Sequence, residues 1–233
     1  MDAALQGILV IDKPLGMTSM RAVERVRRAL GGAKAGHAGT LDPLATGVLL
    51  VAIGRATKQI PFLMGLEKRY ETAIDLSATT ATLDTEGERV PASLAGPPPT
   101  RDDLLRALER FRGAFAQAPP AFSAVKIQGR RAYDLARHGE AVEPAAREVT
   151  VHELHLLDYA WPVARLSIRC AKGFYVRSLA RDLALALGTL GHCLSIRRTA
   201  IGPYDLSMAM PLKDDPTGLA QAIRPFAPPA GSP

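Results

Sequence analysis

The sequence has little of several features that would mark a protein class. Phe, Trp and Tyr make up only 5% of the 233 residues, fewer than a single-strand nucleic-acid binder built on stacked bases would be expected to carry. There are only two cysteines, Cys170 and Cys193, and neither lies in a CxxC pair or near other residues with the spacing of a zinc site. We therefore expect two buried or partly buried free thiols.

The N-terminal region also lacks a targeting signal. No basic segment precedes a long apolar one, and the apolar run at residues 8–11 is too short for a signal peptide or a membrane span. These absences predict a cytoplasmic protein with no membrane association.

The bulk composition is that of a folded protein with a polyanionic partner. A hydrophobic content of 47% and a charged content of 22% are ordinary for a globular chain with a core. The formal net charge of +6 suggests nucleic acid or an anionic surface as the partner. The length allows one large domain, or one domain with an appendage.

Strand-like and helix-like patterns are mixed without a regular alternation, which favours an α+β fold over a doubly wound parallel sheet. Apolar runs and alternating patterns predict strands at 7–12, 48–53, 70–76, 149–157 and 165–171. Helical spacing predicts helices that begin at Thr18 or Ser19, at Thr100, and near residue 176. Residues 33–47 read as a glycine-rich loop, and the chain after Pro203 as a tail with little structure of its own.

Two of the predicted helices carry distinctive faces. The first presents Arg21, Arg25 and Arg28 on one side, which is either a solvated face or a contact for phosphates. The second has Asp103 at the capping-box position after Thr100. Its apolar stripe is expected to contain Leu104, Leu105, Leu108 and Phe111.

The most informative segment is residues 36–58, GHAGTLDPLATGVLLVAIGRATK. Asp42 precedes Pro43, which disfavours a helical conformation at Asp42 and holds its carboxylate on an irregular loop next to a buried strand. Such a loop on a rigid scaffold is a common place for a functional residue. An Asx-turn at the Asp-Pro pair is the alternative that the spacing alone leaves open. A phosphate loop is poorly supported because Gly-Lys-Ser/Thr is missing.

This segment resembles the nucleophile motif of the tRNA pseudouridine synthase B family, which modifies uridine-55 in the TΨC loop of tRNA. Further segments are similar to that family in the same order, over roughly residues 7 to 205: GILVIDKPLGMTS from Gly7, KRYETAIDL from Lys68, PPAFSAVKIQGRRAYDLARHGE from Pro119, AKGFYVRSLARDL from Ala171 and LSIRRTAIG from Leu194. The resemblance implies a pseudouridine synthase-like central sheet, mixed and largely antiparallel, flanked by helices and carrying a thumb-like insertion at about 117–145. It also implies a catalytic domain at 1–205 and a short tail at 206–233, without the C-terminal RNA-binding domain that many relatives carry.

The resemblance assigns catalytic roles to three residues. It implies that Asp42 is the nucleophile and that Tyr70 packs on the target uracil and helps to remove the C5 proton. It further implies that Arg177 pairs with the nucleophilic carboxylate. Taken alone, Tyr70 would fit a core aromatic on a strand face, and Arg177 a surface arginine at the start of a helix.

The resemblance also implies contacts with the substrate. His37 is expected to enter the RNA loop near the flipped nucleotide, Tyr175 to lie beside the arginine of the KGxYxR pattern, and Ile196 to border the base. Taken alone, His37 would be an ordinary loop histidine and Ile196 a core residue. The basic side chains expected to contact RNA phosphates are Lys126, Arg130, Arg131 and Arg137 in the insertion, with Arg197 and Arg198 as further candidates that would equally fit structural ion pairs.

The chemistry explains these residue types. Uridine must leave its stack before its atoms can be reached. A carboxylate can then act as a covalent nucleophile that divides one difficult step into two. Desolvation would raise the pKa of such a carboxylate, and a neighbouring guanidinium opposes that shift. No metal or cofactor is required.

Departures from the family pattern are local. Ala81 stands in TATLD (residues 80–84) where an acid is usual, and Phe174 stands where a small polar residue is common. We expect changed loop or RNA contacts at Ala81, and changed packing beside Tyr175.

The expected partner is tRNA, through its TΨC stem-loop, with a monomeric enzyme and no obligate protein partner. One alternative is a pseudouridine synthase for another RNA. A second is a tRNA-folding chaperone, which would tolerate Asp42→Asn. A glycoside hydrolase is less well supported, because such enzymes use paired carboxylates and no partner acid stands out.

Overall fold

The structure is a computed structural model that describes residues 5–122, 126–127, 130–131, 144–212 and 215–226. The chain forms two compact units. The first unit comprises Met1–Lys68 and Arg197–Pro233, and the second comprises Arg69–Ile196. Strand β12 (His192–Ile201) contributes residues to both units.

The first unit is built on a small mixed sheet. Strand β1 (Gly7–Lys13) pairs antiparallel with β3 (Ala45–Ile53) and parallel with β14 (Met210–Pro211). Strand β2 (Ala35–His37) pairs antiparallel with β3, and the short β13 (Tyr204–Asp205) pairs with the end of β12. The expected loop at 33–47 therefore contains a strand, because its residues 35–37 continue the ladder along β3.

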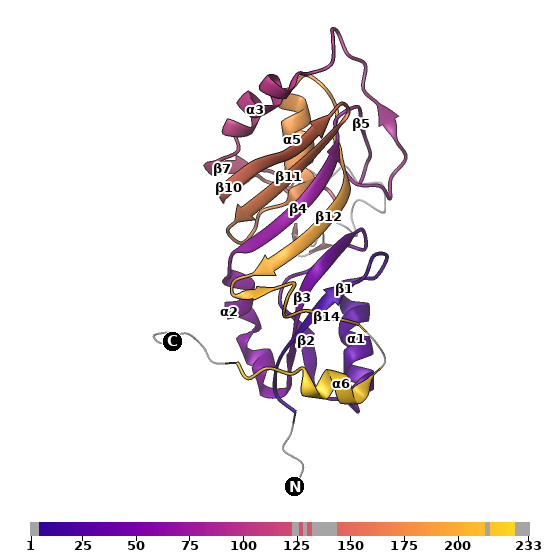
Figure 1. The fold of residues 1–233 in the computed structure, drawn as a ribbon, viewed down its shortest axis with the longest axis vertical. Helices are drawn as coiled ribbons and strands as arrows, with labels where there is room; N and C mark the ends of the chain where they lie inside the picture. Colours follow the sequence, from indigo (N-terminus) through magenta and orange to yellow (C-terminus); the bar gives the residue numbers. More distant parts are fainter. Residues whose placement is uncertain (1–4, 123–125, 128–129, 132–143, 213–214, 227–233) are drawn as a thin grey trace. The chain divides into compact units, whose positions relative to one another are not determined.

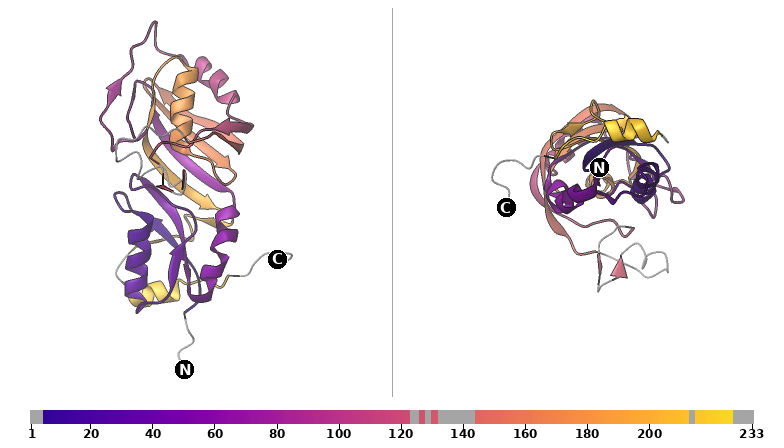
Figure 2. Two further views of the ribbon diagram at one scale, coloured as in Figure 1. Left: turned by 180° about the vertical axis from the view of Figure 1, so that it is seen from behind. Right: turned by 90° about the horizontal axis from the view of Figure 1, so that it is seen from below.

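Helices cover both faces of this sheet (Figures 1 and 2). Helix α1 (Ser19–Ala29) and helix α6 (Pro216–Gln221) pack against one face, and the 3-10 helix η1 (Gly54–Gln59) and helix α2 (Ile60–Gly65) pack against the other. Successive residues of β1 alternate between the two cores: Leu9 and Ile11 face α1, whereas Ile8 and Val10 face α2. A strand covered on both faces needs apolar residues at every position, which explains the continuous apolar runs.

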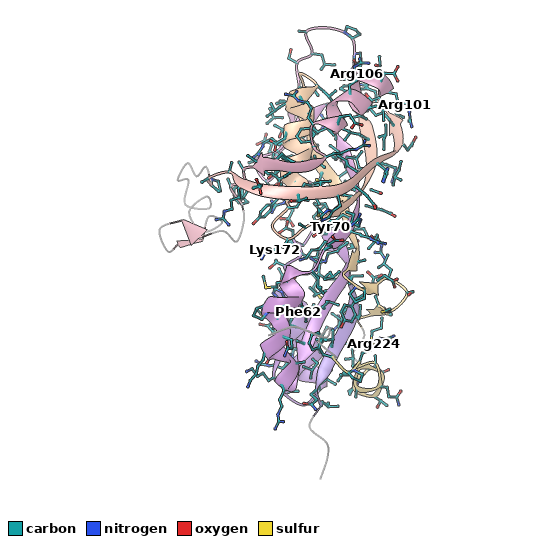
Figure 3. The ribbon with its side chains drawn as sticks, turned by 90° about the vertical axis from the view of Figure 1, so that its left-hand side faces the viewer. Phe62, Tyr70, Arg101, Arg106, Lys172 and Arg224 are labelled. Atoms are coloured by element: carbon teal, nitrogen blue, oxygen red, sulfur yellow. The ribbon has the colours of Figure 1, made fainter. Side chains whose placement is uncertain are left out.

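The C-terminal segment is more ordered than its composition predicted. Strand β14 and helix α6 both lie after Pro203, and Ile8 forms a β-bridge with Arg224. Leu219 is fully buried in the α1 core, and the Phe62 and Phe226 rings meet edge to face, 5.9 Å apart (Phe62 is labelled in Figure 3). The expectation of little structure was wrong because a few apolar side chains dock this segment.

The strands of the second unit follow the order β12-β4-β11-β10-β7. The last four are formed by Lys68–Asp75, Val163–Cys170, Arg147–Ala160 and Gly113–Gln117. Strand β10 is antiparallel to both β11 and β7. Helix α5 (Val176–Ala186) lies against one face of these strands (Figures 1 and 2) and buries Leu179 and Leu183. The predicted α+β class, with a mixed and largely antiparallel sheet flanked by helices, is confirmed.

Helix α3 (Arg101–Glu109) begins with the predicted capping box, because Thr100 and Asp103 each accept a hydrogen bond from the other's backbone N–H. Its apolar stripe is narrower than predicted, since Leu105 is 39% exposed while Leu104 is fully buried. Before this helix in the chain, β5 (Ala78–Thr79) and β6 (Val90–Pro91) pair antiparallel as a hairpin.

Part of the predicted insertion is a second hairpin. Strands β8 (Lys126–Ile127) and β9 (Arg130–Arg131) pair antiparallel, with Lys126 opposite Arg131. The backbone thus brings three of the four predicted RNA-contact residues of the insertion together. The fourth, Arg137, lies outside the described residues.

Candidate active site

The predicted nucleophile lies on a loop that connects β2 and β3 in the first unit. Asp42 is half-buried and the loop around it is irregular, as its sequence predicted. Hydrogen bonds fix both ends: the Ala38 N–H donates to the Leu50 carbonyl (2.9 Å) and the Ala45 N–H donates to the carbonyl of Asp42 itself (3.0 Å). Backbone hydrogen bonds therefore hold the loop at both of its ends.

Ser19 holds the residue before Asp42. Its hydroxyl donates to the Leu41 carbonyl (3.0 Å) and accepts from the Leu41 N–H (2.8 Å). Thr18 is the N-cap of α1 and accepts from the Arg21 N–H, so the helix does not need the Ser19 hydroxyl for its cap. The sequence offered Thr18 and Ser19 as equivalent caps and gave no sign of this contact, which joins residues 22 positions apart.

Arg198 forms hydrogen bonds with backbone carbonyls on both sides of Asp42 in the chain. Its guanidinium, 1% exposed, donates to the carbonyls of Val48 (2.7 Å), Gly39 (3.1 Å) and Thr40 (3.4 Å). A Cβ on Gly47, whose φ is +99°, would lie 2.2 Å from the carbonyl oxygen of Arg198. Gly47 is thus required for the backbone of β12 to approach this closely.

A second buried cation, Lys13, lies in the electrostatic surroundings of Asp42. Its ammonium donates to the carbonyls of Pro14 (3.0 Å) and Met17 (2.5 Å). Burial lowers the pKa of Lys13 to about 8; the negative charge of Asp42 opposes that shift and the charge of Arg198 adds to it. Lys13 therefore still carries a proton at pH 7, but holds it less firmly than an exposed lysine.

His37 ends strand β2. Burial, and secondarily the charge of Arg198, lowers its pKa below the ordinary 6.5. Its Nδ1 is buried and is the one such side-chain nitrogen or oxygen without a hydrogen-bond partner among the described residues. The ring is accordingly neutral at pH 7.

Arg177 is the second buried arginine and belongs to the second unit. It donates from Nη1 to the Thr82 carbonyl (2.8 Å) and from Nη2 to the Phe122 carbonyl (2.9 Å), and lies 3.6 Å from the Asp84 carboxylate. The hydroxyl of Thr82 donates to the same carboxylate (2.5 Å). Sequence reasoning did not select Asp84, although it ends the TATLD segment that resembles the family pattern.

The backbone next to Arg177 is also fixed. Buried Gln117 donates to the Tyr175 carbonyl (3.1 Å) and accepts from the Tyr175 N–H (2.8 Å). Ser178 donates to the Ala118 carbonyl. The start of α5 is therefore tied to the end of β7, a contact that the sequence did not reveal.

The remaining predicted residues fall as follows. Tyr70 is half-buried on β4 (Figure 3), and Ile196 is 5% exposed on β12. Arg197 pairs with Asp12 (2.8 Å), as the structural alternative required. Asp42 and His37 thus belong to the first unit, whereas Tyr70, Tyr175, Arg177 and Ile196 belong to the second.

Three further features of the described residues concern metal binding, the cysteines and membrane-spanning helices. No group of three or more His, Cys, Asp or Glu side chains within them has an arrangement that could hold a metal ion. Cys170 and Cys193 are buried thiols that form no disulfide, as predicted. Among the helices that the structure describes, none has the length and apolarity to cross a membrane.

Comparisons with known proteins agree on a family. Residues 27–176 match the model described as "TruB family pseudouridylate synthase (N terminal domain)". A tRNA pseudouridine synthase B from Pseudomonas paraeruginosa is 48% identical over 90% of this chain and 68% of its own length. One from a Ruegeria species is 52% identical over 86% of this chain and 66% of its own length.

A similar solved structure is a Cbf5-Nop10-Gar1 complex. Its matching chain has a TM-score of 0.73 and 28% identity, over 94% of this chain and 60% of that chain. The chain thus spans about two thirds of the length of the two tRNA pseudouridine synthases and somewhat less of the chain in the solved structure.

Proposed function

The chain belongs to the TruB family of pseudouridylate synthases, and on that premise we propose that it isomerises uridine-55 in the TΨC loop of tRNA with Asp42 as the nucleophile. The observation that carries the proposal is the Asp42 loop: in a chain of this family, an acidic residue stands on an irregular loop whose neighbouring backbone groups are held by Ser19 and Arg198. A catalytic group held in one position gains rate from orientation.

The reaction needs no oxidant or reductant, because uridine and pseudouridine are isomers. The bond between N1 and the ribose C1′ breaks and a bond between C5 and the same C1′ forms. C5 loses its proton, and N1 gains one. A carboxylate that bonds to the substrate for part of this sequence divides it into two easier steps.

The charges in the first unit suit an anionic nucleophile. Lys13 is buried, and its electrostatic interaction with Asp42 is attractive. Lys13 thus adds to the role that the sequence motifs give to Arg177.

The roles of the other residues remain proposals that rest on the motifs. We assign Tyr70 and Arg177 to catalysis, and His37, Tyr175 and Ile196 to contacts with the nucleotide. Lys126, Arg130, Arg131 and Arg137 are assigned to phosphates of the stem-loop. In that case the affinity for tRNA should fall as the salt concentration rises, because these Lys and Arg side chains displace counterions from the RNA phosphates when they bind. A monomeric enzyme acting in the cytoplasm completes the proposal.

Tritium release tests this function. A tRNA transcript labelled with tritium at C5 of its uridines loses label only at a uridine that is isomerised. The protein should release one equivalent per tRNA, and none from a transcript in which uridine-55 is replaced by cytidine. Equal release from both transcripts would assign the enzyme to another uridine.

The chaperone alternative makes the opposite forecast. A protein that only refolds tRNA would release no tritium, yet would accelerate recovery of a misfolded transcript. That pair of results would overturn the proposed reaction.

A further inference from the structure

We propose that Ser19 is a positioning residue that fixes the Asp42 carboxylate through the backbone of Leu41; the inference rests on the proposed function. Asp42 lies outside helix and strand, so the contacts that hold its neighbours help to set its direction. Ser19 supplies the contact on the upstream side, and the segment that leads into Ser19 supplies the contact downstream.

The upstream contact is a donor–acceptor pair. The Ser19 hydroxyl bonds both the N–H and the carbonyl of Leu41, at 2.8 and 3.0 Å. These two groups are separated by the φ and ψ rotations of Leu41 itself. A single oxygen that bonds both of them therefore restricts both rotations, and with them the direction in which the chain enters Asp42.

The downstream contact comes from the same segment of chain. The Gly16 N–H donates to the Pro43 carbonyl (2.8 Å). The turn that contains Gly16 is itself closed by the Lys13 ammonium, which bonds the carbonyls of Pro14 and Met17. Within the stretch from Lys13 to Ser19, Ser19 and Gly16 thus form hydrogen bonds with the residues immediately before and after Asp42.

Burial makes the Ser19 contact hard to replace. Ser19 is 2% exposed and Leu41 is 4% exposed, so water does not reach the site freely. Removal of the hydroxyl leaves two buried backbone groups without their partner. The loop then regains hydrogen bonds only by moving, and Asp42 moves with it.

The competing explanation is that Ser19 only stabilises the fold. Thr18 provides a control, because it is the adjacent residue, also carries a hydroxyl, and uses that hydroxyl to cap the same helix by accepting from the Arg21 N–H. Both Ser19→Ala and Thr18→Ala remove a hydroxyl at the start of α1. Only Ser19→Ala removes one that is bonded next to Asp42.

The experiment compares wild type, Ser19→Ala and Thr18→Ala at a temperature at which all three are folded. It measures the single-turnover rate of tritium release, the Kd for the tRNA transcript, and the amide hydrogen exchange of Leu41. Ser19→Ala should lower the rate about 10- to 100-fold, the range expected for a small misplacement, with Kd unchanged and faster exchange at Leu41. Thr18→Ala should lower the Tm while its rate stays near that of wild type.

Two results would overturn the inference: a Ser19→Ala rate no lower than that of Thr18→Ala, or unchanged Leu41 exchange with a rate loss that follows weaker RNA binding. Failure of the underlying function is distinct from either, because wild type itself would then release no tritium.

Discussion

Two buried arginines, one in each unit, are held in different ways. Arg177 is 5% exposed and Arg198 is 1% exposed, and each donates to backbone carbonyls. Arg177 also lies 3.6 Å from the carboxylate of Asp84. Arg198 spreads its donors over three carbonyls, and its charge adds to the lowering of the Lys13 and His37 pKa values that burial causes.

The difference indicates two uses for a buried guanidinium. At Arg177 the carboxylate of Asp84 lies 3.6 Å away, and the two backbone carbonyls fix the direction of the guanidinium. At Arg198 the planar fork bonds the loop that carries Asp42, and its charge reaches neighbouring titratable groups. Removing the carboxylate beside Arg177 should therefore lower the free energy of unfolding most. Displacing the backbone of Arg198 should have the next largest effect.

The largest expected effect on stability comes from making Arg177 lose its countercharge. Asp84→Asn should lower the free energy of unfolding by about 3 kcal/mol, because it removes a buried carboxylate that lies 3.6 Å from the buried guanidinium of Arg177. Glu109→Gln, which breaks the exposed pair with Arg112, should cost less than about 1 kcal/mol. Urea denaturation measures both. Equal losses of unfolding free energy would show that burial of the ion pair does not increase its contribution to stability.

The next effect disturbs the backbone of Arg198. Gly47→Ala should destabilise the protein by about 2 kcal/mol, because the added Cβ meets the Arg198 carbonyl in a positive-φ conformation. Gly113→Ala is the control: its φ is also positive (+73°), but no atom lies within 4 Å of the added Cβ. The excess cost at Gly47 reports the close approach. If the two thermal melts shift equally, backbone strain alone is responsible.

The smallest effect concerns the pKa of Lys13, which burial lowers and to which the charge of Arg198 adds a smaller lowering. The folded-state pKa of Lys13 is about 8 against an ordinary value of 10.5. Between these pH values the unfolded chain binds more protons, so the stability of the wild type should rise with pH. Lys13→Met removes this contribution. The stability difference, wild type minus Lys13→Met, should therefore grow from pH 8 to 10.5, and a difference that stays constant would contradict the shifted pKa.

Local patterns predicted much of the fold, and long-range contacts account for what was missed. The capping box at Thr100 and the helix that follows Tyr175 depend on neighbours three or four residues apart, which a sequence shows directly. The bond between Ser19 and Leu41 spans 22 residues, and that between Arg198 and Gly39 spans 159. No periodicity encodes such contacts.

The errors have related causes. Leu105 was placed in the core because helical spacing does not show how wide the buried stripe is. The C-terminal segment is predicted to be unstructured because its composition is dominated by small residues and proline, yet two buried leucines, Leu212 and Leu219, pack it into the α1 core. The motif resemblance selected Asp42, but not the residues that hold its loop.

Single-turnover tritium release by Asp42→Asn tests the central claim most directly. Asn keeps the size of Asp42 and removes its charge, so the account predicts a rate loss of at least about a thousand-fold with tRNA binding intact. Asp215→Asn is the control, since Asp215 is the N-cap of α6 and Asn caps equally well; its rate should equal that of wild type. An Asp42→Asn variant that released tritium at the wild-type rate would contradict the account and remove Asp42 from the chemistry.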